Sequence, residues 1–249
     1  MTRSNSPSVT LDTHFHLDLC QDPAATVRQI DAARVYTIAV TNTPAVFPAT
    51  VRLVRDSKYV RAAVGLHPEL AVERGSELRL FRRYLSQTRY VGEVGLDYVT
   101  TVEGDRRAQR RVFENVIVEC RAAGRKVVTI HSRRAAADVV DVVGVDFPGA
   151  WILHWFSGSQ SVLSRAVRMG AFFSINSVMA ESAHTAALVG AIPPERILIE
   201  SDGPFINIDG RPATPMALSG VVRRLAEWWN VDVAEAQSRL KTNARQLLQ

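Results

Sequence analysis

The segment Arg196-Ile-Leu-Ile-Glu-Ser-Asp202 is an apolar run that ends with two acidic residues. A near-continuous apolar run of this length is typical of a strand in a parallel sheet that is buried on both faces. Glu200 and Asp202 are two residues apart, so on an extended chain their side chains lie on the same face. The stretch therefore predicts a buried parallel strand whose C-terminal end carries two carboxylates.

Seven more apolar runs come earlier in the chain, and segments with helical character fill the gaps between runs. The runs cover residues 9–13, 35–41, 59–65, 90–95, 126–131, 150–154 and 170–175. Helices are predicted over residues 105–124, 133–144, 159–169, 217–229 and 232–248, and residues 207–215 are expected to form a loop over the barrel mouth. Eight strands that alternate with helices favour a closed α/β barrel, the (β/α)8 TIM barrel, although this pattern alone also allows an open sheet.

The size and composition fit a single barrel domain over residues 1–249. A barrel of this kind takes about 250 residues. Hydrophobic residues make up 47% of the chain, which is enough to form a full core. The net charge of +5 is compatible with an anionic partner such as nucleic acid without requiring one. The chain has two cysteines without a CxxC motif, no apolar signal-peptide core and no long apolar stretch, which predicts a reduced cytoplasmic protein without a membrane span.

Five of the six histidines lie at or just after the C-terminal end of a predicted strand, which is the end that carries the active site in barrel enzymes. His14 and His16 are two residues apart, so both imidazoles face one side of an extended chain and are able to share a metal ion. Taken alone, the pair is equally compatible with a polar strand end that bonds to nearby loops. His184 lies in a helical segment and is interpreted as a surface residue.

Four further strands bring ionisable side chains to the same rim. Glu93 lies inside an apolar strand, where a charge is costly unless it is paired or bound to a metal. His131 and His154 each end an apolar run, and the acidic pair ends the eighth run. Four imidazoles and three carboxylates are enough for two divalent ions about 3.5–4 Å apart that share a carboxylate, for which Glu93 is the natural choice.

Two such ions generate hydroxide at neutral pH and hold the attacking and leaving oxygens of a phosphodiester. Asp202, or Glu200 beside it, is then the candidate to take the proton from water. A serine or cysteine nucleophile is less favoured, because there is no GxSxG motif and neither cysteine is next to a histidine. The absence of GxxxxGK[ST] and GxGxxG motifs argues against nucleotide triphosphates and dinucleotide cofactors.

These residues resemble the TatD family of metal-dependent deoxyribonucleases, a branch of the amidohydrolase-like barrels. The likeness runs from Asp12 to the C-terminus and is specific because several motifs occur together. The motifs are Asp12-Thr-His-Phe-His-Leu-Asp18, Gly65-Leu-His-Pro68, Gly92-Glu-Val-Gly-Leu-Asp97, His131-Ser-Arg133, His154-Trp-Phe-Ser-Gly158, Glu200-Ser-Asp-Gly-Pro204 and Thr242-Asn-Ala-Arg245.

The resemblance implies roles for individual residues. The metal ligands would be His14, His16, Glu93, His131, His154 and Asp202, with Glu200 holding a further metal or taking part in catalysis. His67 would lie near the substrate phosphate, and Arg133 would orient the substrate or a ligand. Trp155, Phe156 and Ser157 belong to the loop expected to face the substrate, although Trp155 is equally compatible with packing and with stacking on a base.

Some blocks are similar to a narrower group, QatD, the TatD-like component of the Qat anti-phage system. They are Thr43-Pro44, Gly65-Leu-His-Pro-Glu-Leu70, His131-Ser-Arg-Arg134, His154-Trp-Phe-Ser-Gly-Ser159 and Gly210-Arg-Pro-Ala-Thr-Pro215. This likeness implies a role in antiviral defence with protein partners encoded beside the gene. The segment after Asp97 lacks the aromatic and basic residues that are common in TatD proteins, which puts ordinary DNase behaviour in question.

Three functions are therefore compared. The first is a nuclease that trims single-stranded DNA or strand ends as a 3′–5′ exonuclease with two divalent ions, Mg, Mn or Zn. Imidazole-rich ligation favours Zn, Mn, Fe or Co over Mg, whereas the resemblance implies Mg. The second is an amide or ester hydrolase or deacylase, because the same ligands serve both chemistries. The third is a non-catalytic subunit of a defence complex, which intact ligands disfavour.

Overall fold

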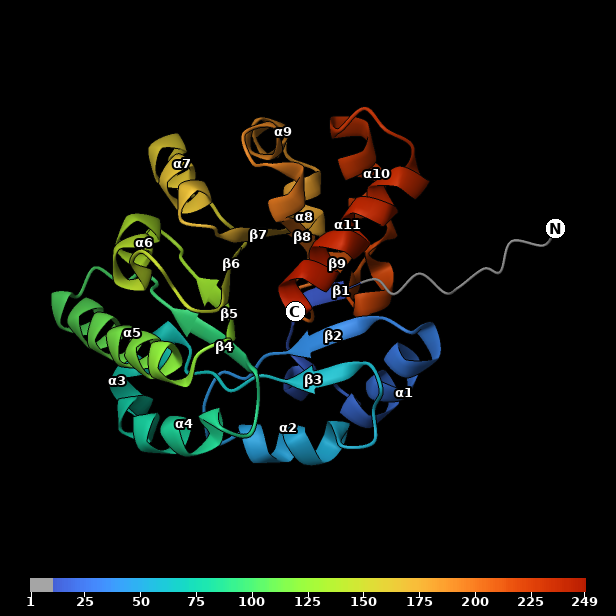
Figure 1. Cartoon of the computed structure of the whole chain (residues 1–249). Coiled ribbons are helices and arrows are strands. Elements are labelled where there is room, and N and C mark those ends of the chain that lie inside the picture. Colours follow the sequence, from blue (N-terminus) through green and yellow to red (C-terminus); the bar gives the residue numbers. More distant parts are fainter. Residues whose placement is uncertain (1–10) are drawn as a thin grey trace.

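The structure is a computed structural model that describes residues 11–249. Eight parallel strands form a ring with helices around the outside (Figure 1). The fold class predicted from the sequence, an amidohydrolase-like α/β barrel, is confirmed. The strands are β1 (Leu11–Phe15), β2 (Tyr36–Ala39), β3 (Val60–Ala62), β4 (Tyr90–Gly95), β5 (Val127–His131), β6 (Ala150–His154), β7 (Phe172–Ile175) and β8 (Ile197–Ile199).

Two parallel sheets join to close the ring. One has the order β1-β2-β3 and the other the order β4-β5-β6-β7-β8. A parallel bridge between Val64 and Val91 joins β3 to β4. On the other side, the Asp202 N–H donates to the His14 carbonyl over 3.0 Å and the His16 N–H donates to the Gly203 carbonyl over 2.9 Å. The closing seam between β1 and β8 therefore runs directly beside residues predicted to bind metal.

The helices follow the strands as predicted for alternating units. They are α1 (Pro23–Ala33), α2 (Phe47–Val54), α3 (Ala71–Arg74), α4 (Leu78–Leu85), α5 (Glu103–Ala123), α6 (Ala136–Val143), α7 (Gln160–Arg168), α8 (Ser177–Ala180), α9 (Ala183–Gly190), α10 (Ser219–Trp228) and α11 (Val233–Leu248). In α5, Val112, Val116 and Cys120 form one buried stripe, and the helix ends at Gly124, whose φ is 63°. A positive φ favours glycine, which explains this stop.

Some predicted boundaries differ from the structure. The first strand was predicted over residues 9–13, of which residues 9 and 10 lie outside the described residues, and it continues to Phe15. Helix α6 begins three residues later than predicted because Arg134 adopts a φ of 56° in a turn. The predicted loop 207–215 contains the two-residue strands β9 (Asn207–Ile208) and β10 (Arg211–Pro212). Asp209 and Gly210, both with positive φ, make the tight turn between them.

The barrel interior changes from apolar to ionisable along the strands. At the N-terminal ends of the strands, a buried cluster that includes Val127, Ile152, Phe172 and Leu198 packs against Leu247 of α11. Figure 1 shows α11 crossing the ring with the C-terminus near its middle. Along β5, Val127 is followed at intervals of two by Thr129 and His131, so the polar residues lie nearer the opposite end. The apolar layer closes one end, and the ionisable side chains gather at the other.

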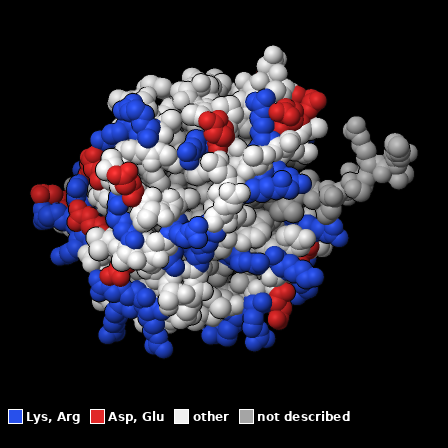
Figure 2. Space-filling view, in the orientation of Figure 1, with Lys and Arg blue, Asp and Glu red and all other residues white. Residues whose placement is uncertain are grey.

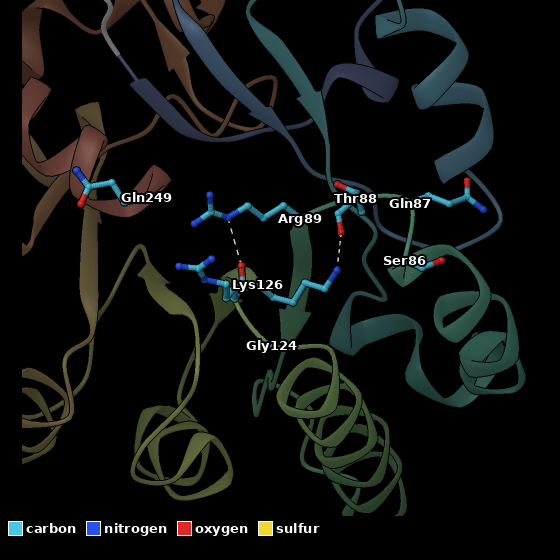
Figure 3. Close-up of a pocket in the computed structure, with 8 residues that line it drawn as sticks. Ser86, Gln87, Thr88, Arg89, Gly124, Lys126 and Gln249 are labelled. Carbon is cyan, nitrogen blue, oxygen red and sulfur yellow. Dashed lines mark hydrogen bonds between the residues drawn. The ribbon is translucent and has the colours of Figure 1, made fainter.

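A cavity of about 380 Å³ lies at the closed end, before β4 and β5, and its cations bind carbonyl groups (Figure 3). The buried Lys126 ammonium donates to the Leu85 and Thr88 carbonyls over 2.6 and 2.7 Å. Arg89 donates to the carbonyls of Leu248 and Arg125 over 2.5 and 3.2 Å. These contacts with carbonyl groups give Arg89 and Lys126 a structural role.

Figure 2 shows Lys and Arg side chains spread over the face viewed in Figure 1, with fewer acidic side chains among them.

Residues 11–249 include no helix that combines the length and the apolar character needed to cross a bilayer.

Candidate metal centre

The two histidines of the β1 end point at one another and at two carboxylates. Their Nε2 atoms are 3.2 Å apart, and both rings are buried. Each Nε2 lies 3.4 Å from Glu93 Oε2. The distance from Asp202 Oδ1 is 3.9 Å to His14 Nε2 and 3.6 Å to His16 Nε2. The sequence prediction that His14 and His16 share a face is confirmed, and four ligand-type atoms converge on one point.

The second oxygen of Glu93 faces a different group of histidines. Glu93 Oε1 lies 2.7 Å from His131 Nδ1, 3.1 Å from His154 Nε2 and 3.5 Å from His67 Nε2. The register between β4 and β5 is irregular between Val91 and Val94, at the point where Glu93 enters the barrel. Glu93 is only 3% exposed. Its carboxylate therefore lies between the β1 histidines and a second group, made up of His67 after β3 and the histidines that end β5 and β6.

Each of three histidine rings has its other nitrogen held by a partner. His14 Nδ1 lies 2.9 Å from Thr129 Oγ1, and His131 Nε2 lies 2.7 Å from Asp97 Oδ2. His154 Nδ1 lies 3.4 Å from Glu200 Oε1. Such partners fix the orientation and tautomer of a metal-binding histidine. The sequence motif that ends at Asp97 predicts no role for this residue. Its position just after a strand is the feature that could have indicated one.

Changing Asp97 to Asn is expected to lower the affinity for divalent metal by about 10–100-fold, because His131 loses the charged partner that orients its ring. Burial opposes the charge on His131, but hydrogen bonds to Asp97 and Glu93 outweigh it and raise the His131 pKa to about 8. Isothermal titration with Mn²⁺ measures the affinity. Asp105→Asn, which changes an acid in α5 that bonds to Thr100, is the matched control. Equal affinities of Asp97→Asn and the wild type would contradict this role.

Glu200 lies behind His154 and is fully buried. It accepts hydrogen bonds from Asn176 Nδ2 over 3.1 Å, from the Trp155 N–H over 3.2 Å and from the Ser174 hydroxyl. Burial opposes its charge, but attraction and hydrogen bonding from His154 lower the Glu200 pKa. Its oxygens are therefore engaged by protein donors, and Glu200 does not line the cavity described below.

Asp12 links β1 to the segment that follows β8. Its Oδ1 accepts from the His14 N–H over 3.0 Å and from the Ser201 N–H over 3.1 Å, and its Oδ2 accepts from the Ser201 hydroxyl over 2.5 Å. Burial raises the Asp12 pKa to about 7 despite these donors. Asp12 thus holds the backbone of β1 and of the β8 end, rather than a histidine ring.

The charges at the centre are strongly coupled. Burial opposes the charge on Glu93, but His67, His14 and His131 hold its pKa well below the ordinary value. Burial likewise opposes the positive charge on His154. Glu200 and Glu93 outweigh this effect and hold the His154 pKa well above its ordinary value. Burial raises the Asp202 pKa to about 8, and repulsion from Glu200 and Glu93 adds to this effect against the attraction of His154. In the metal-free protein, protons therefore balance part of the negative charge.

The residues present fit divalent metal ions. Three overlapping groups have their ligand atoms close enough to hold an ion: His14, His16 and Glu93; His67, Glu93 and His131; and His14, His154 and Glu200. In the first group, His16 Nδ1 is buried without a hydrogen-bond partner among the described residues, while its Nε2 faces the other ligand atoms. Imidazole and carboxylate ligands of this kind suit Zn, Mn or Fe.

A cavity of about 630 Å³ opens onto the centre at the C-terminal ends of the strands. Among the predicted substrate residues, those that line it are His67, Arg133, Trp155 and Ser157. Arg133 is the single Lys or Arg in its lining, against Glu69, Glu93, Asp97 and Asp202. Bound cations would offset this acidic wall and so favour an anionic substrate.

Phe156, predicted to face the substrate, is instead 3% exposed and packs edge-to-face on Phe173, with ring centroids 5.5 Å apart. The reason is the backbone at Trp155, whose φ of 42° turns the chain so that Trp155 faces outward and Phe156 inward. The structure adds Phe205, which lines the cavity and was not singled out from the sequence. His184 is exposed in α9, as predicted.

A parallel barrel that gathers histidines and carboxylates at the C-terminal ends of its strands belongs to the class of metal-dependent hydrolases with an amidohydrolase-like fold. Comparison of the sequence with known families narrows this class. The model of the family described as TatD related DNase matches residues 11–249, and the chain therefore belongs to this family.

Relatives and solved structures agree with this assignment. The chain is 28% identical over 252 residues to the uncharacterised metal-dependent hydrolase YabD of Bacillus subtilis, covering 95% of this chain and 97% of that protein. It is 28% identical over 170 residues to the 3′-5′ ssDNA/RNA exonuclease TatD of Edwardsiella piscicida, covering 63% and 64%. The structure of YjjV, a TatD homologue from Escherichia coli K12, matches with a TM-score of 0.83 at 23% identity, covers 96% and 97%, and supports the fold alone.

Proposed function

We propose that the protein hydrolyses phosphodiester bonds at the ends of single-stranded DNA with two divalent metal ions. The observation that carries this proposal is the placement of Glu93, whose two oxygens face two different sets of histidines. His14, His16 and Asp202 would hold one ion, and His131 and His154 the other. A carboxylate shared by two ions is the arrangement that two-metal phosphoesterases use.

The bound ions would activate water and stabilise the charge that develops on the phosphate. The protein supplies the other steps. Asp202 takes a proton from the attacking water, since it faces the histidine pair and also lines the cavity. Glu200, engaged by Asn176 and the Trp155 backbone, holds the His154 ring in position.

Arg133 and His67 would bind the substrate phosphate. Arg133 is exposed and lines the cavity. His67 Nε2 lies 3.5 Å from Glu93 Oε1, and the ring is partly exposed to the cavity. A guanidinium and an imidazole beside the ions suit a phosphate oxygen. The name of the Edwardsiella relative supports a strand end cleaved from 3′ to 5′.

A panel of substrates tests the proposal. The purified protein is incubated with Mg²⁺, Mn²⁺ or Zn²⁺ and with oligonucleotides labelled at the 5′ or the 3′ end. Aminoacyl and p-nitrophenyl ester substrates are included under the same conditions. A ladder that shortens one nucleotide at a time from the 3′ end supports the proposal. Ester or amide cleavage without any action on DNA would assign the same centre to the alternative hydrolase chemistry.

We further propose that this activity serves anti-phage defence together with proteins encoded beside the gene. Support comes from the sequence blocks around His131 and His154 and from residues 210–215, which are similar to the QatD group. The test compares phage plaques on cells that carry the complete gene cluster with wild-type protein or with Asp202→Asn. Full protection by Asp202→Asn would favour a non-catalytic role in the complex.

A further inference from the structure

The exposed aromatic side chains of this protein are confined to one place. All of its Phe, Trp and Tyr residues lie within residues 11–249, and only Trp155 and Phe205 are exposed, at 38% and 60%. Both line the cavity above the metal centre. Burying a side chain of this size is worth about 1.5–3 kcal/mol, so two open rings on one rim indicate a surface that binds a ligand.

Both rings are attached closely to the residues of the centre. Trp155 follows His154 directly, and its N–H donates to Glu200 Oε1 over 3.2 Å. Its φ of 42° is a costly conformation for a bulky residue, and such strain persists where the surrounding structure enforces it, commonly at functional sites. This backbone holds the indole outward at the cavity rim.

Phe205 is held in the segment that follows β8. Its N–H donates to the Asp202 carbonyl over 3.1 Å, which closes a tight turn after β8. Its ring meets the His16 ring edge-to-face, with centroids 4.8 Å apart and an interplanar angle of 86°. The contact with His16 therefore fixes the position of the ring, while 60% of Phe205 stays exposed.

The ligand that fits these features has a flat π-face and a phosphate. The centre and Arg133 accept the phosphate, and the two rings offer apolar faces beside it. Stacking of a nucleobase on an aromatic side chain is worth about 1–3 kcal/mol, tolerates any base and requires that the base is unpaired. Apart from Arg133, the lining has no Lys or Arg to track a long backbone. Recognition therefore falls on the bases next to the reacting phosphate.

We propose that Trp155 and Phe205 form a stacking platform for the unpaired bases on the two sides of the scissile phosphodiester. The platform rests on the proposed function and deepens it, because it makes the substrate a single-stranded end recognised by base stacking without sequence preference. Paired ends present their bases already stacked within the duplex and do not reach the platform.

The test combines changes in the protein with changes in the substrate. Oligonucleotides of one sequence carry either normal bases or abasic tetrahydrofuran residues at the last two positions. The wild type is expected to favour the normal oligonucleotide by about 30-fold or more in kcat/KM, mainly through KM, as two stacked bases imply. In Phe205→Ala and Trp155→Ala this preference falls toward 1, whereas Phe205→Tyr and Trp155→Phe keep it.

The preference ratio separates binding from a structural effect. A change that only disturbs the centre slows both substrates equally and leaves the ratio as in the wild type, and that result would overturn the platform. Val118→Ala, which shortens an exposed side chain on α5, is the matched control and is expected to keep the wild-type ratio.

A second measurement does not depend on turnover. Titration of Asp202→Asn with the normal oligonucleotide is expected to quench tryptophan emission, and the added change Trp155→Phe removes this quenching. The abasic oligonucleotide quenches less. If the wild type cleaves neither oligonucleotide but quenching occurs, the proposed hydrolysis fails while the platform stands. If cleavage occurs with equal quenching by both oligonucleotides, the platform fails while the proposed function stands.

Discussion

The Asp202→Asn variant is expected to cleave single-stranded DNA about 10²–10⁴-fold more slowly than the wild type, the range that a positioned general base contributes. Asp202 Oδ1 lies 3.9 and 3.6 Å from the Nε2 atoms of His14 and His16, and its side chain lines the cavity. An amide in its place accepts no proton and is a poorer ligand for a divalent ion. The loss is measured as kcat on a labelled oligonucleotide under metal saturation.

The same variant is expected to fold as well as the wild type. Burial raises the folded-state pKa of Asp202 to about 8, well above 3.8, the ordinary value that the group has in the unfolded chain. The folded protein therefore favours the protonated acid, and its relative stability falls as the pH rises from about 4 through 8. Asparagine removes this loss, so metal-free Asp202→Asn should match the wild type at low pH and exceed it near pH 9 in thermal unfolding.

Asp56→Asn is a suitable control for both measurements, because this acid is 91% exposed and, among residues 11–249, pairs only with the neighbouring Arg55. It should keep the wild-type rate and the wild-type dependence of stability on pH. Wild-type cleavage by Asp202→Asn would remove Asp202 from catalysis, even if the metal centre itself remained.

The sequence was sufficient to predict the site residues at positions where an unpaired polar side chain would destabilise the fold. Glu93 interrupts an apolar strand, and His131 and His154 end such strands, so each required a partner, and the structure brings all three within 3.4 Å of one another. A period of two residues correctly predicted the shared face of His14 and His16, because extended chains leave few alternatives. The strand boundaries mattered little to this result.

Partners from other strands were harder to predict. Thr129 contacts His14 across the barrel, and Ser174 contacts Glu200, but both hydroxyls lie in ordinary β-strand sequences without a distinguishing pattern. Phe156 was misplaced because the alternation of faces fails where Trp155 takes a positive φ. Phe205 gave no signal because an isolated aromatic residue in a loop is equally suited to packing and to exposure. These features depend on loop geometry and on contacts distant in sequence, which local patterns do not encode.

Removing divalent metal is expected to abolish DNA cleavage and to lower the melting temperature, with both recovered when metal is restored. Each metal that binds only the folded state adds about 2.7 kcal/mol at a concentration 100 times its Kd. For a chain of this size, that corresponds to roughly 5–11 °C. Binding must also release protons, because burial holds Asp202 protonated up to about pH 8, and Asp97 and Glu93 keep the His131 pKa near 8 against its burial. Affinity should therefore rise with pH up to about 8 and then level off.

Calorimetry in two buffers of different ionisation enthalpy counts the released protons, and unfolding curves with and without chelator give the stability. His16→Ala should lose most of the stabilisation by metal, since His16 Nε2 is one of the atoms that converge on Glu93 and Asp202. His184→Ala, which changes an exposed histidine of α9, should retain it. Cleavage that survives exhaustive chelation would show that the reaction does not need metal ions. Affinity that is independent of pH between 6 and 8 would show that Asp202 and His131 are not among the groups that metal must deprotonate.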